Sequence, residues 1–394
     1  MSAGRVIGLG CRLNIAESER IGEMLAGQRD LVVINSCSVT GTAVRNTRQT
    51  IRRVRRANPH ARLIVTGCAA ETERAELAAM AEVDALVPNA AKLDPRLYGV
   101  LDPAQARSPR PAPARTRAFV AIQNGCDHAC TFCIIPQGRG PSRSLPVGAV
   151  LREVEGHLAR GAAEIVLTGV DVTSWGSDLA DSPRLGKLLQ SILDRFPELG
   201  RLRLSSLDGA EIDPLLFELI AGEARVMPHL HLSLQHGHDL ILKRMKRRHL
   251  RRDAVNLVAE LRGRRSGIAI GADLISGFPT ESEEHHRANM SLVAVLGIVH
   301  GHVFPFSPRH GTPAARMPQL DPALIAGRAA ELRAAVASTR AEWLASLVGT
   351  PLRVLAERDG RGYAENYARV ATPGIAPGTI ATIIPTACED ELLR

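Results

Sequence analysis

Aromatic residues are scarce in this chain of 394 residues, where Phe, Trp and Tyr together make up 3%. A surface that grips single-stranded nucleic acid by repeated base stacking needs more of them, so that class of binding protein is poorly supported. Long hydrophobic runs are missing as well. No apolar stretch approaches the roughly 20 residues of a membrane-spanning helix, so no membrane partner is expected.

Two further shortages concern the cellular compartment. Residues 1–11 lack the charged region, apolar run and cleavage site of a secretory signal, and we therefore expect a cytoplasmic protein. Cysteine is limited to seven residues. Cytosolic cysteines rarely form disulfides, and they more often bind metal, take part in catalysis or pack in the interior. Their spacing decides among these roles.

The hydrophobic content and the length of the chain indicate how many domains it forms. Hydrophobic residues form 45% of the chain, and the length exceeds that of one ordinary core, so two or three domains are expected. The formal net charge of +8 favours an anionic partner without identifying it.

The first hundred residues alternate short apolar runs with helical patterns. This alternation predicts an N-terminal domain, residues 1–100, built as a small open α/β sheet with helices on both faces. Its predicted strands are 31–34, 63–65 and 85–87, and its predicted helices are 15–26, 42–57 and 71–82. Residues 101–117 contain four prolines and no periodicity, which indicates a stiff linker.

Strand and helix patterns then resume on a larger scale. Residues 118–320 are predicted to form a partial (β/α)6 barrel, with its active site at the carboxyl ends of the strands. The six predicted strands are 118–123, 164–168, 201–204, 230–234, 268–274 and 300–306. Residues 321–349 indicate one long connecting helix, and 350–394 indicate a small β-barrel module with glycine turns.

The strongest chemical signal is a C-x3-C-x2-C loop directly after the first barrel strand, formed by Cys126, Cys130 and Cys133. Thiolates are the usual ligands of iron–sulphur clusters, and three of them leave one iron of a cubic cluster open to an exogenous ligand. The alternative is a zinc site with His128 as the fourth ligand, although this triplet is not a usual zinc spacing.

Three more cysteines lie upstream, each at or just after a strand end: Cys11, Cys37 and Cys68. The carboxyl ends of parallel strands face one crevice, so these distant thiols are predicted to converge and hold a second cluster. The alternative is that each is a small buried hydrophobic residue. Cys388 matches no motif.

The two triads together make the chain similar to the methylthiotransferase family of radical-SAM enzymes. The matching segments are Gly-Cys11-Arg-Leu-Asn, Asn-Ser-Cys37-Ser-Val-Thr, Thr-Gly-Cys68-Ala and the Cys126 loop. The resemblance implies two 4Fe–4S clusters and S-adenosylmethionine, whose cleavage gives a 5′-deoxyadenosyl radical, while the auxiliary cluster holds the sulphur to be inserted. The last module resembles a TRAM domain, which implies RNA binding.

The segment Ile134-Ile-Pro-Gln-Gly-Arg139-Gly-Pro-Ser-Arg143-Ser144 resembles the branch of this family that acts on threonylcarbamoyladenosine in tRNA. The resemblance implies transfer of a methylthio group to carbon 2 of the adenine, a flavodoxin- or ferredoxin-like electron donor, and a sulphur source. Isopentenyladenosine in tRNA and a ribosomal-protein aspartate are the alternative substrates. A non-enzymatic RNA-binding protein with structural metal is the alternative class.

Other candidate site residues follow from position. Polar or small residues at barrel strand ends are predicted to contact S-adenosylmethionine, although each equally suits a helix cap: Gly169, Asp171, Ser205, Ser206, Gln235 and Asp273. The resemblance also exposes a departure, because Gln235-His236-Gly237 stands where relatives have Gln-Ser-Gly. A basic run without acids is predicted to bind RNA phosphates or to be a solvated helix face: Lys243, Arg244, Lys246, Arg247, Arg248, Arg251 and Arg252.

Overall fold

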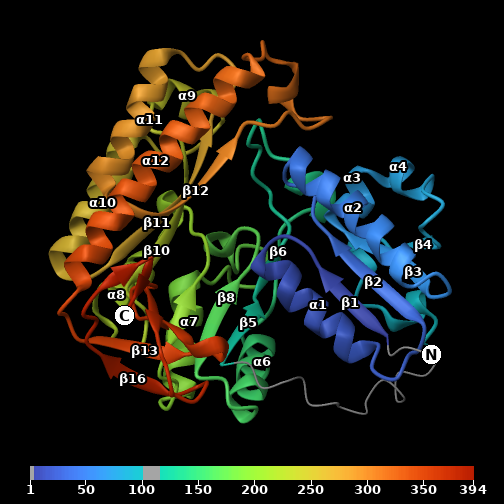
Figure 1. The fold of residues 1–394 in the computed structure, drawn as a ribbon, viewed down its shortest axis with the longest axis horizontal. Helices are drawn as coiled ribbons and strands as arrows, with labels where there is room; N and C mark the ends of the chain where they lie inside the picture. The colour runs from blue at the N-terminus through green and yellow to red at the C-terminus, as the bar shows by residue number, and fades with distance from the viewer. Residues whose placement is uncertain (1–3, 101–115) are drawn as a thin grey trace. The chain divides into compact units, whose positions relative to one another are not determined.

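The computed structural model describes residues 4–100 and 116–394. They fall into two compact units whose segments alternate along the chain (Figure 1). The first unit, called here the thiol unit, comprises Met1–Ala114, Gln123–Arg143 and Ser307–Ala315. The second, called the barrel unit, comprises Arg115–Ile122, Ser144–Phe306 and Arg316–Arg394. Most of the predicted linker, residues 101–115, lies outside the described residues.

The thiol unit is built on a parallel sheet of order β1-β2-β3-β4, which confirms the predicted open α/β sheet. Its strands are β1 (Arg5–Gly8), β2 (Leu31–Ser36), β3 (Arg62–Gly67) and β4 (Ala85–Leu86). Its N-terminal helices are α1 (Arg12–Met24), α2 (Gly41–Ala57), α3 (Cys68–Thr72) and α4 (Arg74–Ala78), followed by the turns η1 (Asn89–Ala91) and η2 (Pro95–Tyr98).

Side chains alternate between the two faces of this sheet, and each face has its own core. Val32 and Ile34 pack with Ile51 of α2 on one face, whereas Val33 packs with Ile21 of α1 on the other. This explains why residues 31–34 of β2 are all apolar, since a strand buried on both faces has no polar side.

Two local features differ from the sequence prediction. Strand β1 was not among the predicted strands because it is only four residues long and none of its residues is fully buried. The predicted helix 71–82 is two short helices, α3 and α4, which meet at Glu73 in a non-helical conformation.

The barrel unit contains the six predicted parallel strands: β5 (Arg117–Ala121), β8 (Glu164–Thr168), β9 (Leu202–Leu204), β10 (His229–Gln235), β11 (Ala269–Ser276) and β12 (Ile298–Pro305). They pair as β5-β8-β9 and β10-β11-β12, and a parallel bridge from Leu207 to Leu232 joins the two groups. The strand–helix alternation thus produces the predicted partial barrel.

Helices surround these strands in Figure 1, and all of them except α9 contribute apolar side chains to one continuous core. They are α6 (Val147–Ala159), α7 (Leu185–Arg195), α8 (Pro214–Gly222), α9 (Asp239–Arg244), α10 (Arg251–Arg264), α11 (Glu283–Leu296) and α12 (Pro322–Leu347), with the turns η4 (Val172–Ser174) and η5 (Gly209–Glu211). Helix α12 is the predicted long helix. No helix among the described residues has the length and apolar character needed to cross a membrane.

The C-terminal module is a six-stranded sheet of order β16-β13-β14-β15-β18-β17. Its elements are β13 (Leu352–Ala356), η7 (Arg358–Gly360), β14 (Arg361–Ala364), β15 (Arg369–Ala371), β16 (Ile380–Ile383), β17 (Cys388–Glu389) and β18 (Leu392–Leu393). Val354, Val370 and Leu393 form its small core together with Leu344 of α12.

This module is fixed to the amino-terminal end of the barrel by buried arginines. Arg201 donates to the Arg353 carbonyl at 2.7 Å, and Arg203 donates to the Glu365 carbonyl at 3.1 Å. Glu164, at the first position of β8, accepts from Arg203 at 3.0 Å. Because the module lies at this end, it leaves the carboxyl ends of the barrel strands clear.

Candidate metal centres and substrate-binding residues

The thiol unit contains both cysteine triads. The loop with Cys126, Cys130 and Cys133 lies between β6 (Gln123–Asn124) and α5 (Ile135–Arg139), and β7 (Arg143–Ser144) follows it. All three cysteines are partly buried.

Hydrogen bonds close the ends of this loop on each other. The Cys126 amide donates to the Gly140 carbonyl at 3.2 Å, and the Ser142 amide donates to Asp127 at 3.0 Å. Gly125 has a φ of 76°, and a β-carbon there would lie 1.9 Å from the Pro141 carbonyl oxygen. The loop therefore requires glycine at this position, and its backbone is held independently of any metal.

The spacing of these thiols bears on the zinc alternative. Sulphurs that share one tetrahedral zinc lie roughly 4 Å apart, given a Zn–S bond of about 2.3 Å. Among the described residues, no group of three or more ligand atoms within 4.8 Å of one another contains two of these thiols. The arrangement suits a larger polynuclear centre better than a single zinc ion.

The upstream cysteines come together as the sheet topology predicts. Cys11 caps the start of α1 after β1, Cys37 follows β2, and Cys68 begins α3 directly after β3. The loop that carries Cys11 passes close over Cys37, because a β-carbon on Gly10 would lie 2.8 Å from the Cys37 sulphur. Burial raises the pKa of Cys37 to about 11, and the neighbouring Cys68 and Cys11 charges act in the same direction.

Beside this triad lies a buried polar network that the sequence did not indicate. Arg139 donates to the two oxygens of Glu17 at 3.0 and 3.2 Å, and Lys92 donates to the same carboxylate at 2.5 Å. Arg139 also bonds Asn14 and Asn124. The three charged side chains are at most 6% exposed. Their separations in sequence, 75 residues for Lys92 and 122 for Arg139 from Glu17, leave no local pattern to detect.

The predicted cofactor-binding residues lie in the barrel unit at or near strand ends. Gly169 follows β8, and Asp171 caps η4 and accepts from the Ser174 hydroxyl at 2.5 Å. Ser205 and Ser206 follow β9, and the buried Ser205 hydroxyl has no hydrogen-bond partner among the described residues. An unsatisfied buried hydroxyl is costly, which favours a ligand contact at this position.

Gln235 and Asp273 have more specific surroundings. Gln235 ends β10 at a bulge, with a φ of 72°. One oxygen of Asp273 lies 3.1 Å from both the His231 and the His302 imidazoles. Burial would raise the pKa of Asp273, but these imidazoles hold it well below its usual range. In this structure, Asp273 bonds neighbouring side chains.

The departure at His236 has a structural account. Its imidazole lies 3.2 Å from Glu281, which also bonds Arg328 at 3.0 Å and the Gly277 amide at 2.9 Å. Both His236 and Glu281 are buried. His236 therefore fixes the turn after β11.

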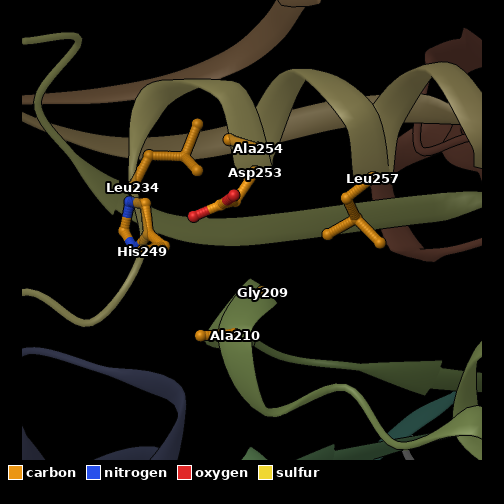
Figure 2. Close-up of a pocket in the computed structure, with 7 residues that line it drawn as sticks. All are labelled: Gly209, Ala210, Leu234, His249, Asp253, Ala254 and Leu257. Carbon is orange, nitrogen blue, oxygen red and sulfur yellow. The ribbon is translucent and has the colours of Figure 1, made fainter. Parts of the chain in front are cut away.

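A small pocket lies in the barrel unit between η5 and α10 (Figure 2). Leu234, Leu257 and Ala210 make it largely apolar, and His249 and Asp253 line one side. At about 20 Å³ it holds roughly one water molecule, so it is too small for S-adenosylmethionine.

The basic run separates into structural and exposed members. Arg247 donates to Asp208 at 3.0 Å and to the Ser233 carbonyl at 2.7 Å, and Arg251 donates to the Ala288 carbonyl at 2.7 Å. Arg244 bonds Thr280 at 2.7 Å, and the half-exposed Arg248 bonds Glu211 at 2.7 Å. The exposed side chains are those of Lys243, Lys246, Arg248 and Arg252, and Arg252 also lies 3.6 Å from Asp253.

Family models match most of the described chain. Residues 120–293 match the model described as the radical SAM superfamily, and residues 5–88 match the one described as uncharacterized protein family UPF0004. Threonylcarbamoyladenosine tRNA methylthiotransferase MtaB of Rickettsia prowazekii (strain Madrid E) is 41% identical over 92% of this chain and 89% of its own length. This chain belongs to the radical-SAM methylthiotransferase family. Membership makes it an enzyme that uses S-adenosylmethionine and 4Fe–4S clusters.

More distant methylthiotransferases also match over most of their length. The MtaB enzyme of Bacillus subtilis (strain 168) is 32% identical over 93% of this chain and 89% of its own. A tRNA-2-methylthio-N(6)-dimethylallyladenosine synthase of Paracoccus denitrificans (strain Pd 1222) is 31% identical over 89% and 85%. Among solved structures, the radical S-adenosylmethionine methyltransferase TsrM of Kitasatospora setae has a TM-score of 0.54 at 16% identity, covering 82% of this chain and 80% of that one. That last likeness concerns the fold alone.

The residues present fit the cofactors of the family. Two sets of three thiols lie in one unit, and neither set is arranged for a single zinc ion. The individual ligand assignments to Cys11, Cys37, Cys68, Cys126, Cys130 and Cys133 stay predictions, as do the residues around S-adenosylmethionine.

Proposed function

We propose that this enzyme converts threonylcarbamoyladenosine, next to the anticodon of tRNA, to its 2-methylthio derivative. The observation that carries the proposal is the 41% identity over 92% of the chain to an enzyme named for that activity. The reaction replaces the hydrogen on carbon 2 of the adenine with a methylthio group. One S-adenosylmethionine would supply the methyl group, and a second, bound at the cluster that Cys126, Cys130 and Cys133 would hold, would supply the radical.

The chain's own residues hold this chemistry in place. The bonds from Cys126 to Gly140 and from Ser142 to Asp127 fix the cysteine loop before any ligand arrives. The Ser205 hydroxyl, which has no hydrogen-bond partner among the described residues, would donate to a bound S-adenosylmethionine. Such preorganisation lowers the cost of orienting the reacting groups.

Contacts with tRNA are proposed for three exposed members of the basic run, Lys243, Lys246 and Arg252. Lysine and arginine neutralise phosphates without reading sequence, which suits a large RNA whose target base is recognised elsewhere. Arg244, Arg247, Arg248 and Arg251 shape this surface through the contacts described above. The C-terminal module, which we propose is TRAM-like, would contribute through its own exposed residues.

The remaining partners are inferred from the reaction. Reductive cleavage of S-adenosylmethionine consumes electrons, so we propose a flavodoxin- or ferredoxin-like donor. The inserted sulphur requires a sulphur source, and because the proposed substrate is tRNA, we propose a cytoplasmic location.

Nucleoside mass spectrometry on total tRNA from cells with and without this gene tests the proposal. The 2-methylthio-threonylcarbamoyladenosine should vanish without the gene, while its unthiolated precursor accumulates. If the isopentenyladenosine derivative disappears instead, the substrate belongs to the neighbouring branch, to which several relatives belong. Unchanged tRNA would redirect the search to a protein substrate.

A further inference from the structure

The buried network beside Cys11, Cys37 and Cys68 contains one more positive charge than negative charges. Arg139 and Lys92 share a single carboxylate, that of Glu17, and Lys92 and Arg139 are no more than 3% exposed at their side chains. A buried charge without a counter-charge is costly, so an excess cation requires an anion nearby.

The thiols of the N-terminal triad are candidates for this anion, because their charges act on both cations. Burial alone would lower the pKa of Arg139, but the charges of Cys68, Glu17 and Cys11 raise it. Burial likewise lowers the pKa of Lys92, while Glu17 and Cys68 act in the opposite direction. The charges of Arg139 and Lys92 therefore both interact with the Cys68 sulphur.

Backbone contacts place Arg139 at this position. A β-carbon on Gly138 would lie 3.4 Å from the Cys68 β-carbon, so the chain that leaves the Cys133 loop runs directly against Cys68. The Gly138 carbonyl accepts from the Asn89 side chain at 2.5 Å. One further carboxylate, Glu71, bonds the Asn89 amide at 2.6 Å but is partly exposed, so water screens it.

The anion that fits is the cluster itself. An oxidised cubic 4Fe–4S core with three thiolate ligands carries about one negative charge in total, which matches the excess of one cation. We propose that Arg139, together with Lys92, neutralises the auxiliary cluster held by Cys11, Cys37 and Cys68 and raises its reduction potential. Net charge around a cluster is one of the main determinants of that potential.

This inference rests on the proposed function only for the existence of the auxiliary cluster, and it does not depend on the RNA substrate. The measurement is a redox titration of the reconstituted holoenzyme, monitored by electron paramagnetic resonance. A variant with Cys126, Cys130 and Cys133 changed to Ala retains only the auxiliary signal and assigns it. Failure of the nucleoside experiment would leave this titration interpretable.

Three substitutions separate charge from structure. Arg139→Gln and Lys92→Met each remove a positive charge and should move the auxiliary potential to more negative values. Glu17→Gln removes the negative charge and should move it to more positive values, although it disrupts the same network. A merely structural role would move all three in one direction or none, whereas compensation by charge predicts opposite signs.

Two controls complete the design. Arg139→Lys keeps the charge and should retain most of the wild-type potential. Arg48→Gln removes a partly exposed arginine of the same unit, which pairs with Glu73 at 3.5 Å, and should leave the potential unchanged. If Arg139→Gln cannot hold the cluster, Lys92→Met and Arg139→Lys decide. An unchanged auxiliary potential in Lys92→Met, or a negative shift in Arg139→Lys as large as that in Lys92→Met, would overturn the proposal.

Discussion

At the scale of single residues, the cysteine loop depends on the glycine that precedes it. In Gly125→Ala the new β-carbon would meet the Pro141 carbonyl at 1.9 Å, in a backbone conformation with positive φ. The loop must therefore open, and the variant should lose about four of roughly eight irons and the cleavage of S-adenosylmethionine. Iron analysis and a 5′-deoxyadenosine assay measure this.

The matched control is Gly27→Ala in the same unit. Gly27 also has a positive φ, of 94°, but nothing lies within 4 Å of its added β-carbon. The Gly27→Ala variant should keep its full iron content. Equal iron loss in both variants would show that backbone strain, and not the collision with Pro141, causes the loss in Gly125→Ala.

Individual thiols distinguish the two centres. Cys126→Ala should abolish cleavage of S-adenosylmethionine, because that loop is assigned to the cluster that binds S-adenosylmethionine. Cys11→Ala should retain cleavage and lose methylthiolation, as measured by nucleoside mass spectrometry after single-turnover reaction with tRNA. Full methylthiolation by Cys11→Ala would refute the two-cluster assignment.

At the scale of secondary-structure elements, one carboxylate joins three strands of the barrel to the C-terminal module. Glu164 of β8 accepts from Arg203 at 3.0 Å and lies within 3.3 Å of Arg117 and 3.7 Å of Arg201. Removing one member of a buried ionic group typically costs about 3–5 kcal/mol, because the remaining charges stay buried. Glu164→Gln should therefore lower the free energy of unfolding by about that amount in chemical denaturation.

The pH dependence of this effect has a definite sign. Burial would raise the pKa of Glu164, but Arg203, Arg117 and Arg201 lower it overall. A carboxyl with a depressed folded-state pKa stabilises the protein above its unfolded-state pKa of about 4.3, and that contribution is lost as pH falls through the folded value. The stability difference between wild type and Glu164→Gln should thus be full at pH 7 and shrink in acid. Glu155→Gln, an exposed partner of Arg195, should show no such difference.

The same contacts show which elements the sequence reveals and which it does not. The barrel strands and α12 were predictable because apolar runs and helical periodicity are local signals. The convergence of Cys11, Cys37 and Cys68 followed from parallel-sheet topology. By contrast, Arg201 and Arg203 looked like ordinary strand residues, because their acceptors lie more than 150 residues later, in the C-terminal module. A charged side chain that is buried against a partner far away in the sequence leaves no periodic pattern in the sequence.

At the scale of the whole molecule, the net charge of +8 and the basic run make different predictions for RNA binding. Changing Lys243, Lys246 and Arg252 to Ala leaves +5, that is 8 − 3, and removes three exposed groups. If these contact phosphates, the slope of log Kd against log salt should become shallower by about 2–3, because each phosphate contact contributes roughly 0.7–0.9. Filter binding of tRNA at several salt concentrations measures this slope.

The control removes the same charge elsewhere on the barrel unit, by changing the exposed Arg152, Lys187 and Arg195 to Ala. A general electrostatic field would respond equally to both triple variants, since salt screening acts on total charge at long range. Direct phosphate contact requires that only the first variant loses slope. Arg247 must not serve in this test, because its bonds to Asp208 and the Ser233 carbonyl make its loss a change of structure. Equal slopes in wild type and the first variant would place the tRNA surface elsewhere on the enzyme.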